Sequence, residues 1–148
     1  MLAHTASAEA IFAVENICGM GSRMDYNKIP SAIYIQPEIA SIGLTEDQAR
    51  DKYGDIKVGR FPLMANGKAK IQGEDRGIVK VISESRYGEI VGVHLFCIHA
   101  TEMIAELSVA MGLECTAEEL ARAVHPHPTV SESIFEACHA AVGKAIHF

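Results

Sequence analysis

Long apolar runs, clusters of basic residues and closely spaced cysteines are all missing from this sequence. The apolar stretches are too short to span a membrane, and the opening MLAHTASAEA lacks the basic region with which a signal peptide begins. The 13 Lys and Arg residues are outnumbered by 19 Asp and Glu residues, for a net charge of −6, and do not interleave with aromatic residues. We therefore expect a cytoplasmic protein that binds neither membranes nor nucleic acids.

The four cysteines lie far apart and form no C-x-x-C pair: Cys18, Cys97, Cys115 and Cys138. We interpret them as reduced thiols that mostly pack within an intracellular protein. A zinc site could be drawn from four residues of the C-terminal part, His125, His127, Cys138 and His139. Their spacing matches no standard set of zinc ligands, so we expect no metal.

The remaining pattern is typical of one globular domain, with 148 residues of which 49% are hydrophobic and 22% charged. Short runs of β-branched and aromatic residues predict strands within residues 31–44, 56–64, 77–83 and 88–96, the last two forming a hairpin. Apolar spacing and capping signals predict helices at residues 3–18, 45–52, 100–112, 116–123 and about 130–145. This arrangement indicates an α+β fold, an antiparallel sheet with helices packed on it.

The segment that carries the most chemistry is VHPHPTVSE, at residues 124–132. Pro126 and Pro128 disfavour helical backbone for the residues before them, so His125 and His127 are expected to be extended. The result is a stiff arm that presents His127 just before the last helix.

A capping signal follows this arm. Thr129 or Ser131 is expected to cap the last helix, and Thr129-x-x-Glu132 has the form of a capping box. Glu132 then lies in the first turn, where it can reach back to His127. A histidine held by a carboxylate is an oriented general base. The alternative is a plain His-Pro loop in which Glu132 only caps the helix.

Several motifs in the same order carry a family resemblance. HPHPTVSE resembles the H-x-H-P-T-x-S-E signature that closes lipoamide dehydrogenases, which are class I pyridine nucleotide-disulfide oxidoreductases. YIQPEIASIGLTEDQA, FPLMANGKAKIQGEDRGIVKVI and YGEIVGVHLFCIHATEMIAELSVAM resemble the strands and helices that precede it. MLAHTASAEA is similar to the helix that follows the family's Gly-Asp flavin-binding turn. The resemblance covers nearly the whole chain.

The resemblance implies two parts and a set of flavin neighbours. Residues 1–24 would be a residual helix of the FAD domain, and residues 25–148 the dimerisation domain. The residues near the flavin would be Met1, Leu2, Ala3, His4, His127 and Pro128. FAD and NAD would be cofactors of the full-length enzyme. The chain has no G-x-G-x-x-G turn and no C-x-x-x-x-C pair, so we expect no tightly bound cofactor and no activity in isolation.

The resemblance also implies a mechanism shared between subunits. His127 would take a thiol proton from dihydrolipoamide, free or on a lipoyl domain, at the flavin and disulfide of the partner subunit in a homodimer. Glu132 would orient His127. We expect the apolar face of residues 100–111 and the last helix to form the dimer interface.

Two geometric predictions and several alternatives remain. The His127-Pro128 bond is predicted to be cis and the bond before Pro126 trans, and Glu132 is predicted to accept a hydrogen bond from His127. A stand-alone dimerisation module without catalysis is one alternative. Glutathione reductases usually lack a histidine at the position of His125, and mercuric reductases have a cysteine pair in the tail, so both fit less well. The start at Met1, within a family segment, favours a piece of a longer protein.

Overall fold

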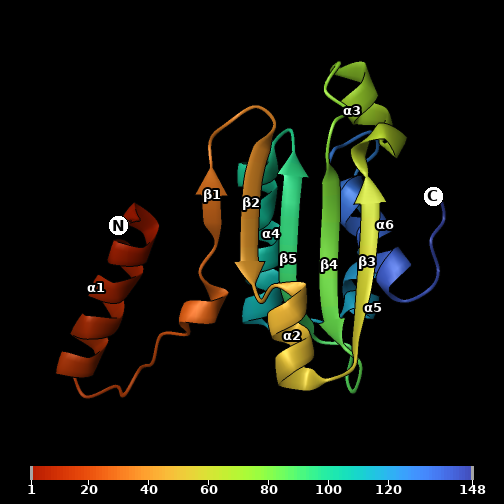
Figure 1. Ribbon diagram of the computed structural model, residues 1–148. Coiled ribbons are helices and arrows are strands. Elements are labelled where there is room, and N and C mark those ends of the chain that lie inside the picture. Colours follow the sequence, from red (N-terminus) through yellow and green to blue (C-terminus); the bar gives the residue numbers. More distant parts are fainter. Residues whose placement is uncertain (1, 148) are drawn as a thin grey trace.

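Five antiparallel strands form one sheet in the computed structural model, which describes residues 2–147 (Figure 1). The strands follow the order β1-β2-β5-β4-β3, with bounds β1 Ser31–Ile33, β2 Glu38–Gly43, β3 Ile56–Pro62, β4 Ile78–Glu84 and β5 Ile90–Cys97. The helices are α1 Ala3–Ile17, α2 Glu46–Tyr53, α3 Gly67–Ile71, α4 Ala100–Gly112, α5 Ala117–Arg122 and α6 Glu132–Ala141, with short 3-10 turns η1 Tyr26–Lys28 and η2 Leu63–Ala65. The expected α+β fold is confirmed.

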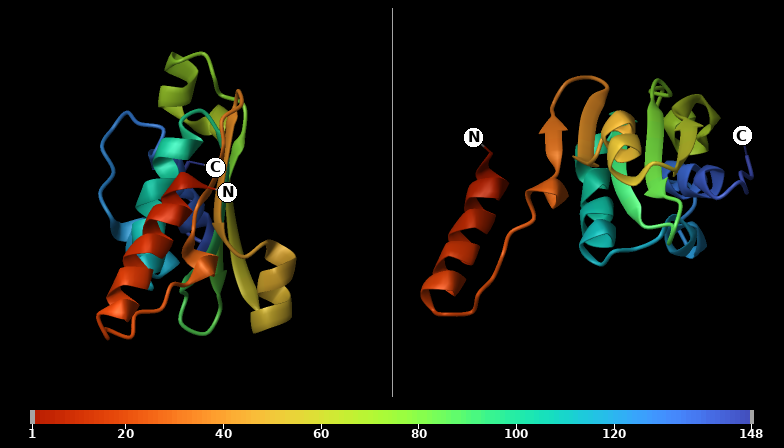
Figure 2. Two further views of the ribbon diagram at one scale, coloured as in Figure 1. Left: turned by 90° about the vertical axis from the view of Figure 1, so that its left-hand side faces the viewer. Right: turned by 60° about the horizontal axis from the view of Figure 1, so that its bottom comes forward.

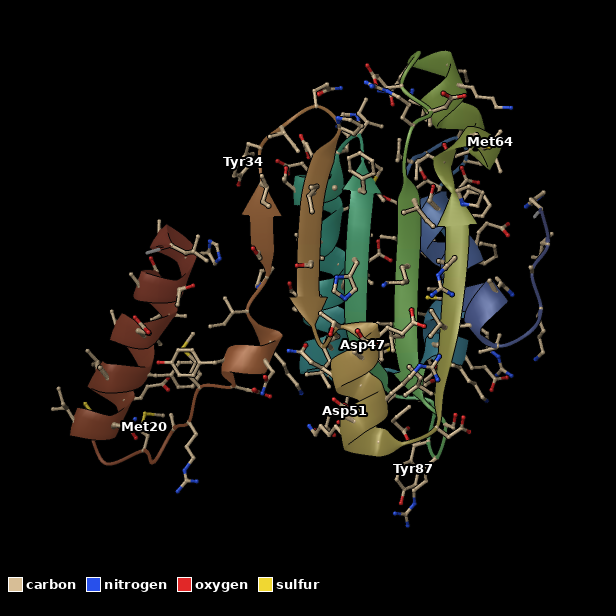
Figure 3. The ribbon with its side chains drawn as sticks, in the orientation of Figure 1. Met20, Tyr34, Asp47, Asp51, Met64 and Tyr87 are labelled. Carbon is tan, nitrogen blue, oxygen red and sulfur yellow. The ribbon has the colours of Figure 1, made fainter. Side chains whose placement is uncertain are left out.

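The helices cover the two faces of the sheet unequally. On one face α4 packs on β2 and β5, and α6 packs on β3 and β4, with α5 against α6. The short α2 lies on the other face (Figure 2), and its exposed Asp47 and Asp51 point away from the sheet (Figure 3). Among residues 2–147, no helix has the length and apolar character of a membrane span.

The core lies between the sheet and the α4–α6 layer. Apolar side chains of the inner strand faces pack there against α4 and α6. The strands contribute Val79, Val93 and Leu95, and the helices contribute Leu107 and Ile134. The apolar stripe of α4, which we expected at a dimer interface, is buried within the chain. For α4 that expectation was wrong, because the sheet already covers this face. Helix α6 also packs on the sheet but leaves Phe135 and Ala140 partly exposed, so its predicted place at the interface stays a prediction.

Capping chemistry sets the helix bounds in two places. Thr45 with Gln48, and Thr116 with Glu119, form complete capping boxes at the starts of α2 and α5, which bears out their predicted starts. The last helix is shorter than expected, because α6 ends at Ala141, two residues before Gly143, whose φ is +72°.

The start of α6 corrects a second expectation. Ser131 is its N-cap residue but makes no side-chain capping bond. The hydroxyl of Thr129 donates to the Pro126 carbonyl at 2.8 Å instead of capping the helix. Only half of the expected capping box is present, the bond from the Thr129 amide to the Glu132 carboxylate.

Helix α1 stands apart from the layers, beyond the edge strand β1 (Figures 1 and 2). None of its residues is buried, and Leu2 precedes it without a side-chain cap. Three side-chain contacts tie it to the segment before the sheet: His4 Nε2 with the Pro30 carbonyl at 2.9 Å, the Asn16 amide, which donates to the Ser22 carbonyl at 2.9 Å, and the Tyr26 hydroxyl, which donates to Glu9 at 3.1 Å.

Candidate active site

The loop between α5 and α6 carries the two histidines of the His-Pro repeat. The His127-Pro128 peptide bond is cis, as is Gln36-Pro37, and these are the cis bonds of the described residues. The sequence therefore predicted the cis bond at Pro128 and the trans bond at Pro126 correctly. The cis bond at Pro37 was not anticipated.

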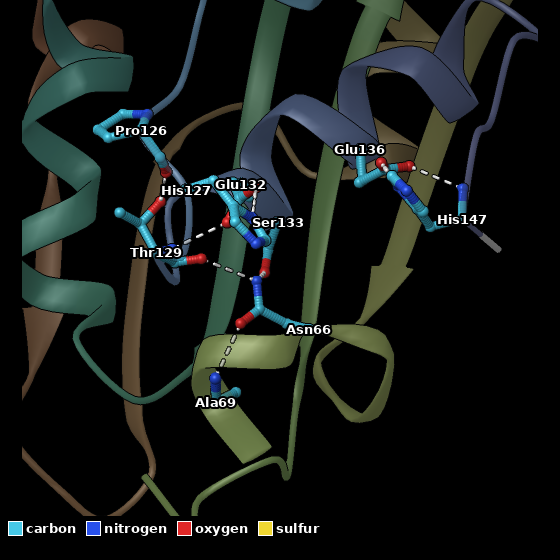
Figure 4. Close-up of polar contacts among 9 residues, drawn as sticks. All are labelled: Asn66, Ala69, Pro126, His127, Thr129, Glu132, Ser133, Glu136 and His147. Carbon is cyan, nitrogen blue, oxygen red and sulfur yellow. Dashed lines mark hydrogen bonds and ion pairs between the residues drawn. The ribbon is translucent and has the colours of Figure 1, made fainter. Parts of the chain in front are cut away.

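His127 and Glu132 form a hydrogen-bonded pair across the start of α6 (Figure 4). His127 Nδ1 lies 2.9 Å from Glu132 Oε1, and the Thr129 amide donates to Glu132 Oε2 at 2.8 Å. Both predicted roles of Glu132, orienting the ring and capping the backbone, are thus present at once, one on each oxygen. The His127 side chain is 80% exposed, so its Nε2 is open to a reactant while Nδ1 is held.

The environment of Glu132 keeps it ionised. Burial raises the pKa of this carboxyl, but the hydrogen bonds from the Thr129 amide and the His127 imidazole outweigh that effect and bring the pKa below its ordinary value of 4.5. A carboxylate with a low pKa remains charged near neutral pH, which is the form that stabilises a protonated imidazole.

His125, the first histidine of the repeat, is bound to a different element. Its Nε2 lies 2.8 Å from Glu106 Oε1 on α4, and its side chain is 7% exposed. The bond to Glu106 raises the pKa of His125 despite its burial. His125 therefore fastens the loop to α4 and is not available to a reactant.

A cavity of about 300 Å³ borders the outer side of the pair, lined by residues that include His127, Glu132, Phe135 and His147. Glu136 at its edge is buried, and its carboxylate accepts the Ile146 and His147 amides at 3.4 Å each and also pairs with the His147 imidazole (Figure 4). The segment after α6 is thereby folded back beside the cavity.

The other expected flavin neighbours lie elsewhere in the fold. Leu2, Ala3 and His4 form the start of α1, beyond the β1 edge, whereas α6 packs on β3 at the opposite edge (Figure 1). Met1 is outside the described residues. One chain therefore does not bring the start of α1 together with the His127–Glu132 pair.

The comparison with protein families decides the family. The model of the pyridine nucleotide-disulphide oxidoreductase dimerisation domain matches residues 29–138. This chain belongs to that family.

Relatives of the dimerisation domain carry consistent names. The dihydrolipoyl dehydrogenase of Bacillus subtilis is 47% identical over an alignment of 148 residues, which covers 99% of this chain and 31% of that protein. Dihydrolipoyl dehydrogenase 3 of Pseudomonas aeruginosa is 45% identical, again over 99% of this chain and 31% of the relative. The chain thus spans about a third of the length of these curated relatives.

Solved structures agree with the fold. A Cu(II) complex of the HOCl-induced flavoprotein disulfide reductase RclA from Escherichia coli matches with a TM-score of 0.84 and 25% identity, over 93% of this chain and 32% of that one. LpdA from Mycobacterium tuberculosis gives a TM-score of 0.79 and 26% identity, over 86% of this chain and 28% of that one.

The four cysteines of the chain form no disulfide bonds with one another. All four are free, and Cys97 and Cys138 are buried. Burial raises the pKa of the Cys97 thiol to about 12 and also raises that of Cys138, so neither is a reactive thiolate. Within residues 2–147 no group of three or more His, Cys, Asp or Glu side chains is arranged to hold a metal, which leaves the alternative zinc site without support.

Three residues near the pair were missed by the sequence interpretation: Asn66, Glu106 and Glu136. Asn66 and Glu106 meet partners 63 and 19 positions away, and Glu136 meets the segment that follows its own helix, so no local motif marks them. Glu106 gives a weak signal, because it is one of two acidic residues, with Glu102, on a largely apolar helix.

Proposed function

We propose that this domain supplies the acid–base group of a dihydrolipoyl dehydrogenase, an FAD- and NAD-dependent oxidoreductase, across the interface of a homodimer. The observation that carries the proposal is the His127–Glu132 contact of 2.9 Å on a histidine whose other nitrogen is exposed. The names of relatives that are 41–47% identical support this enzyme class over other flavin disulfide reductases. Four free cysteines suit the reducing cytoplasm, which we include in the proposal.

The proposed chemistry follows from which nitrogen of His127 is held. The bond to Glu132 assigns the proton to Nδ1 and leaves the Nε2 lone pair as the base. His127 Nε2 would take a proton from a thiol of dihydrolipoamide, free or on a lipoyl domain, and the resulting thiolate would attack a disulfide outside this chain. The dithiol becomes a disulfide as the attacked disulfide is reduced, and Glu132 stabilises the imidazolium formed meanwhile. FAD, when bound, supplies the redox centre that carries the two electrons to NAD⁺.

The start of α1 fits one edge of a flavin. Leu2 is the N-cap, and its carbonyl accepts the first helical bond from Ala6, so the amides of Ala3 and His4 precede the helical ladder. Such amides, at the positive end of the helix dipole, suit an electron-rich ring carbonyl. The His4 ring is occupied by Pro30, so its backbone is the part that fits. The phosphates would need another site, since the sequence has no G-x-G-x-x-G turn.

A two-subunit site is supported by the positions of its two halves. In one chain α1 stands beyond the β1 edge of the sheet (Figure 1), whereas the His127–Glu132 pair lies at the start of α6, which packs on β3 and β4. A flavin that borders α1 of one subunit can meet His127 from another copy instead. Two-fold pairing is the commonest way to close such an exchange, and the family is a dimerisation domain.

A chimaera tests the proposal. The C-terminal part of the B. subtilis dihydrolipoyl dehydrogenase that aligns with this chain would be replaced by it, and NAD⁺-dependent oxidation of dihydrolipoamide measured. We expect activity in the chimaera and a fall of about 10²–10⁴-fold in kcat for His127→Gln, because a positioned acid–base group contributes that much.

The matched control is His99→Asn. His99 is exposed, contacts Gln72, and adopts a φ of +62° that asparagine tolerates. This variant should retain the activity of the chimaera. An active chimaera that keeps its kcat after His127→Gln would disprove the acid–base role.

A further inference from the structure

The buried side chain of Asn66 joins the start of α3 to the segment that carries the His127–Glu132 pair. Asn66 is 4% exposed. Its Nδ2 donates to the Thr129 carbonyl and to Ser133 Oγ, both at 3.0 Å, and its Oδ1 accepts the Ala69 amide at 2.8 Å (Figure 4). Its amide nitrogen and its oxygen are therefore both engaged.

These bonds hold the chain on both sides of Glu132, at the Thr129 backbone and at the Ser133 side chain. Asn66 fixes the carbonyl of Thr129, while the amide of the same residue donates to Glu132 Oε2 at 2.8 Å. Asn66 also holds Ser133, the residue after Glu132. Since the other oxygen of Glu132 contacts His127, the place of the Thr129 backbone decides how the carboxylate faces the imidazole.

We propose that Asn66 is a positioning residue for the His127–Glu132 pair, an inference that rests on the proposed function. It touches neither member of the pair and acts through Thr129 and Ser133. Glu106 holds the same loop at His125, before His127 in the sequence. Asn66 holds Thr129, the residue whose amide orients the Glu132 carboxylate.

A purely structural role would be to cap α3 through the Ala69 amide. Asn66→Asp separates the two roles, because aspartate caps helices as well as asparagine does but has no N–H to donate. The Ser133 hydroxyl can turn to donate to the new carboxylate, whereas the Thr129 carbonyl, a pure acceptor, is left facing it. If capping is the whole role, the His127–Glu132 contact is unaffected, and the Glu132 pKa changes only through the charge of the new carboxylate, which the uncharged Ser133→Ala variant does not introduce.

The first measurement uses this chain itself. The titration of the Glu132 carboxyl would be followed by ¹³C NMR in the wild type and in Asn66→Asp. We expect the Glu132 pKa to rise toward its ordinary value in the variant, because the bond from the Thr129 amide that lowers it is loosened and because the new carboxylate repels the charge of Glu132. A rise in the uncharged Ser133→Ala variant as well would report the loosened bond alone.

The second measurement uses the chimaera with the B. subtilis enzyme. Asn66→Asp should lower kcat about ten- to a hundredfold, the scale of a misplaced catalytic group, shift the pH profile of kcat, and leave KM little changed. The matched control is Asn16→Asp on α1, which makes the same chemical change and removes one donor to the Ser22 carbonyl at 2.9 Å. It should change neither the Glu132 titration nor kcat.

Ser133→Ala is the second variant, for use if Asn66→Asp does not fold. Ser133 is fully buried and accepts from Asn66, so its loss should move the Glu132 pKa in the same direction by less. An unchanged Glu132 titration in every folded variant overturns the positioning role, as does an unchanged kcat for Asn66→Asp where His127→Gln lowers it. If His127→Gln also leaves kcat unchanged, the proposed function fails, and a shifted Glu132 titration still upholds the link from Asn66 to Glu132.

Discussion

Helix α6, which carries Glu132, approaches β3 most closely at Gly59. A Cβ at Gly59 would lie 1.9 Å from the Ala137 carbonyl oxygen and 2.4 Å from the Ala141 amide nitrogen. Both are backbone atoms, so no side-chain rotation relieves the overlap. For that Cβ to reach 3.4 Å from the oxygen, α6 and β3 would have to separate by about 1.5 Å.

This separation gives the expected cost of Gly59→Ala. Overpacking a core by one methyl group costs about 1–3 kcal/mol, and a clash with fixed backbone belongs at the upper end of that range. The lower entropy of the unfolded alanine chain offsets about 0.4–1 kcal/mol. We expect a net loss of about 2 kcal/mol, which for a chain of this length lowers Tm by roughly 6 °C.

Urea unfolding followed by circular dichroism measures the difference. Gly112→Ala is the matched control, because Gly112 ends α4 with nothing within 4 Å of an added Cβ. The control should be neutral or more stable by about 0.4–1 kcal/mol. If Gly59→Ala is as stable as the control, α6 does not pack on β3 as closely as described.

Three further predictions concern capping and pH. Thr116→Ala removes the capping box of α5 and should cost about 1 kcal/mol of unfolding free energy; an unchanged urea midpoint would contradict it. Burial raises the pKa of Glu84, but hydrogen bonds from backbone amides lower it by more. Ionised Glu84 therefore stabilises the fold above the pKa that it has in the unfolded chain, and this stabilisation is lost as pH falls through its lower pKa in the folded state. The Tm difference between wild type and Glu84→Gln should therefore shrink below about pH 4, and a constant difference would refute this. The bond to Glu106 raises the pKa of His125, so its stabilisation is complete below the unfolded pKa of about 6.5 and lost as pH rises through the folded one. The Tm of the wild type should exceed that of His125→Gln by less at pH 9 than at pH 6, and a difference that grows with pH would contradict this prediction.

Local signals in the sequence were enough for most of the elements, and together with the family resemblance for the contact between His127 and Glu132. The capping boxes at Thr45 and Thr116 set helix starts correctly because they depend on residues three apart. The pair also lies within one short segment, since His127 and Glu132 are five residues apart, with Pro126 before His127 and Pro128 after it to limit the backbone.

Features that depend on distant contacts were not predictable in this way. Asn66 meets Thr129 across 63 positions of sequence, and Glu106 meets His125 across a helix and a loop. The apolar stripe of α4 was correctly identified but assigned to the wrong partner, because periodicity shows that a helix face is buried without showing what covers it.

The contacts around His127 come from three separate elements. Glu106 of α4 holds His125, Asn66 at the start of α3 holds Thr129, and Glu132 of α6 holds the imidazole. All three contacts lie within one chain. A proton acceptor whose direction is already fixed loses little freedom when a substrate meets it. In the proposed enzyme, pairing of two subunits would then place His127, already oriented by Glu132, beside the flavin.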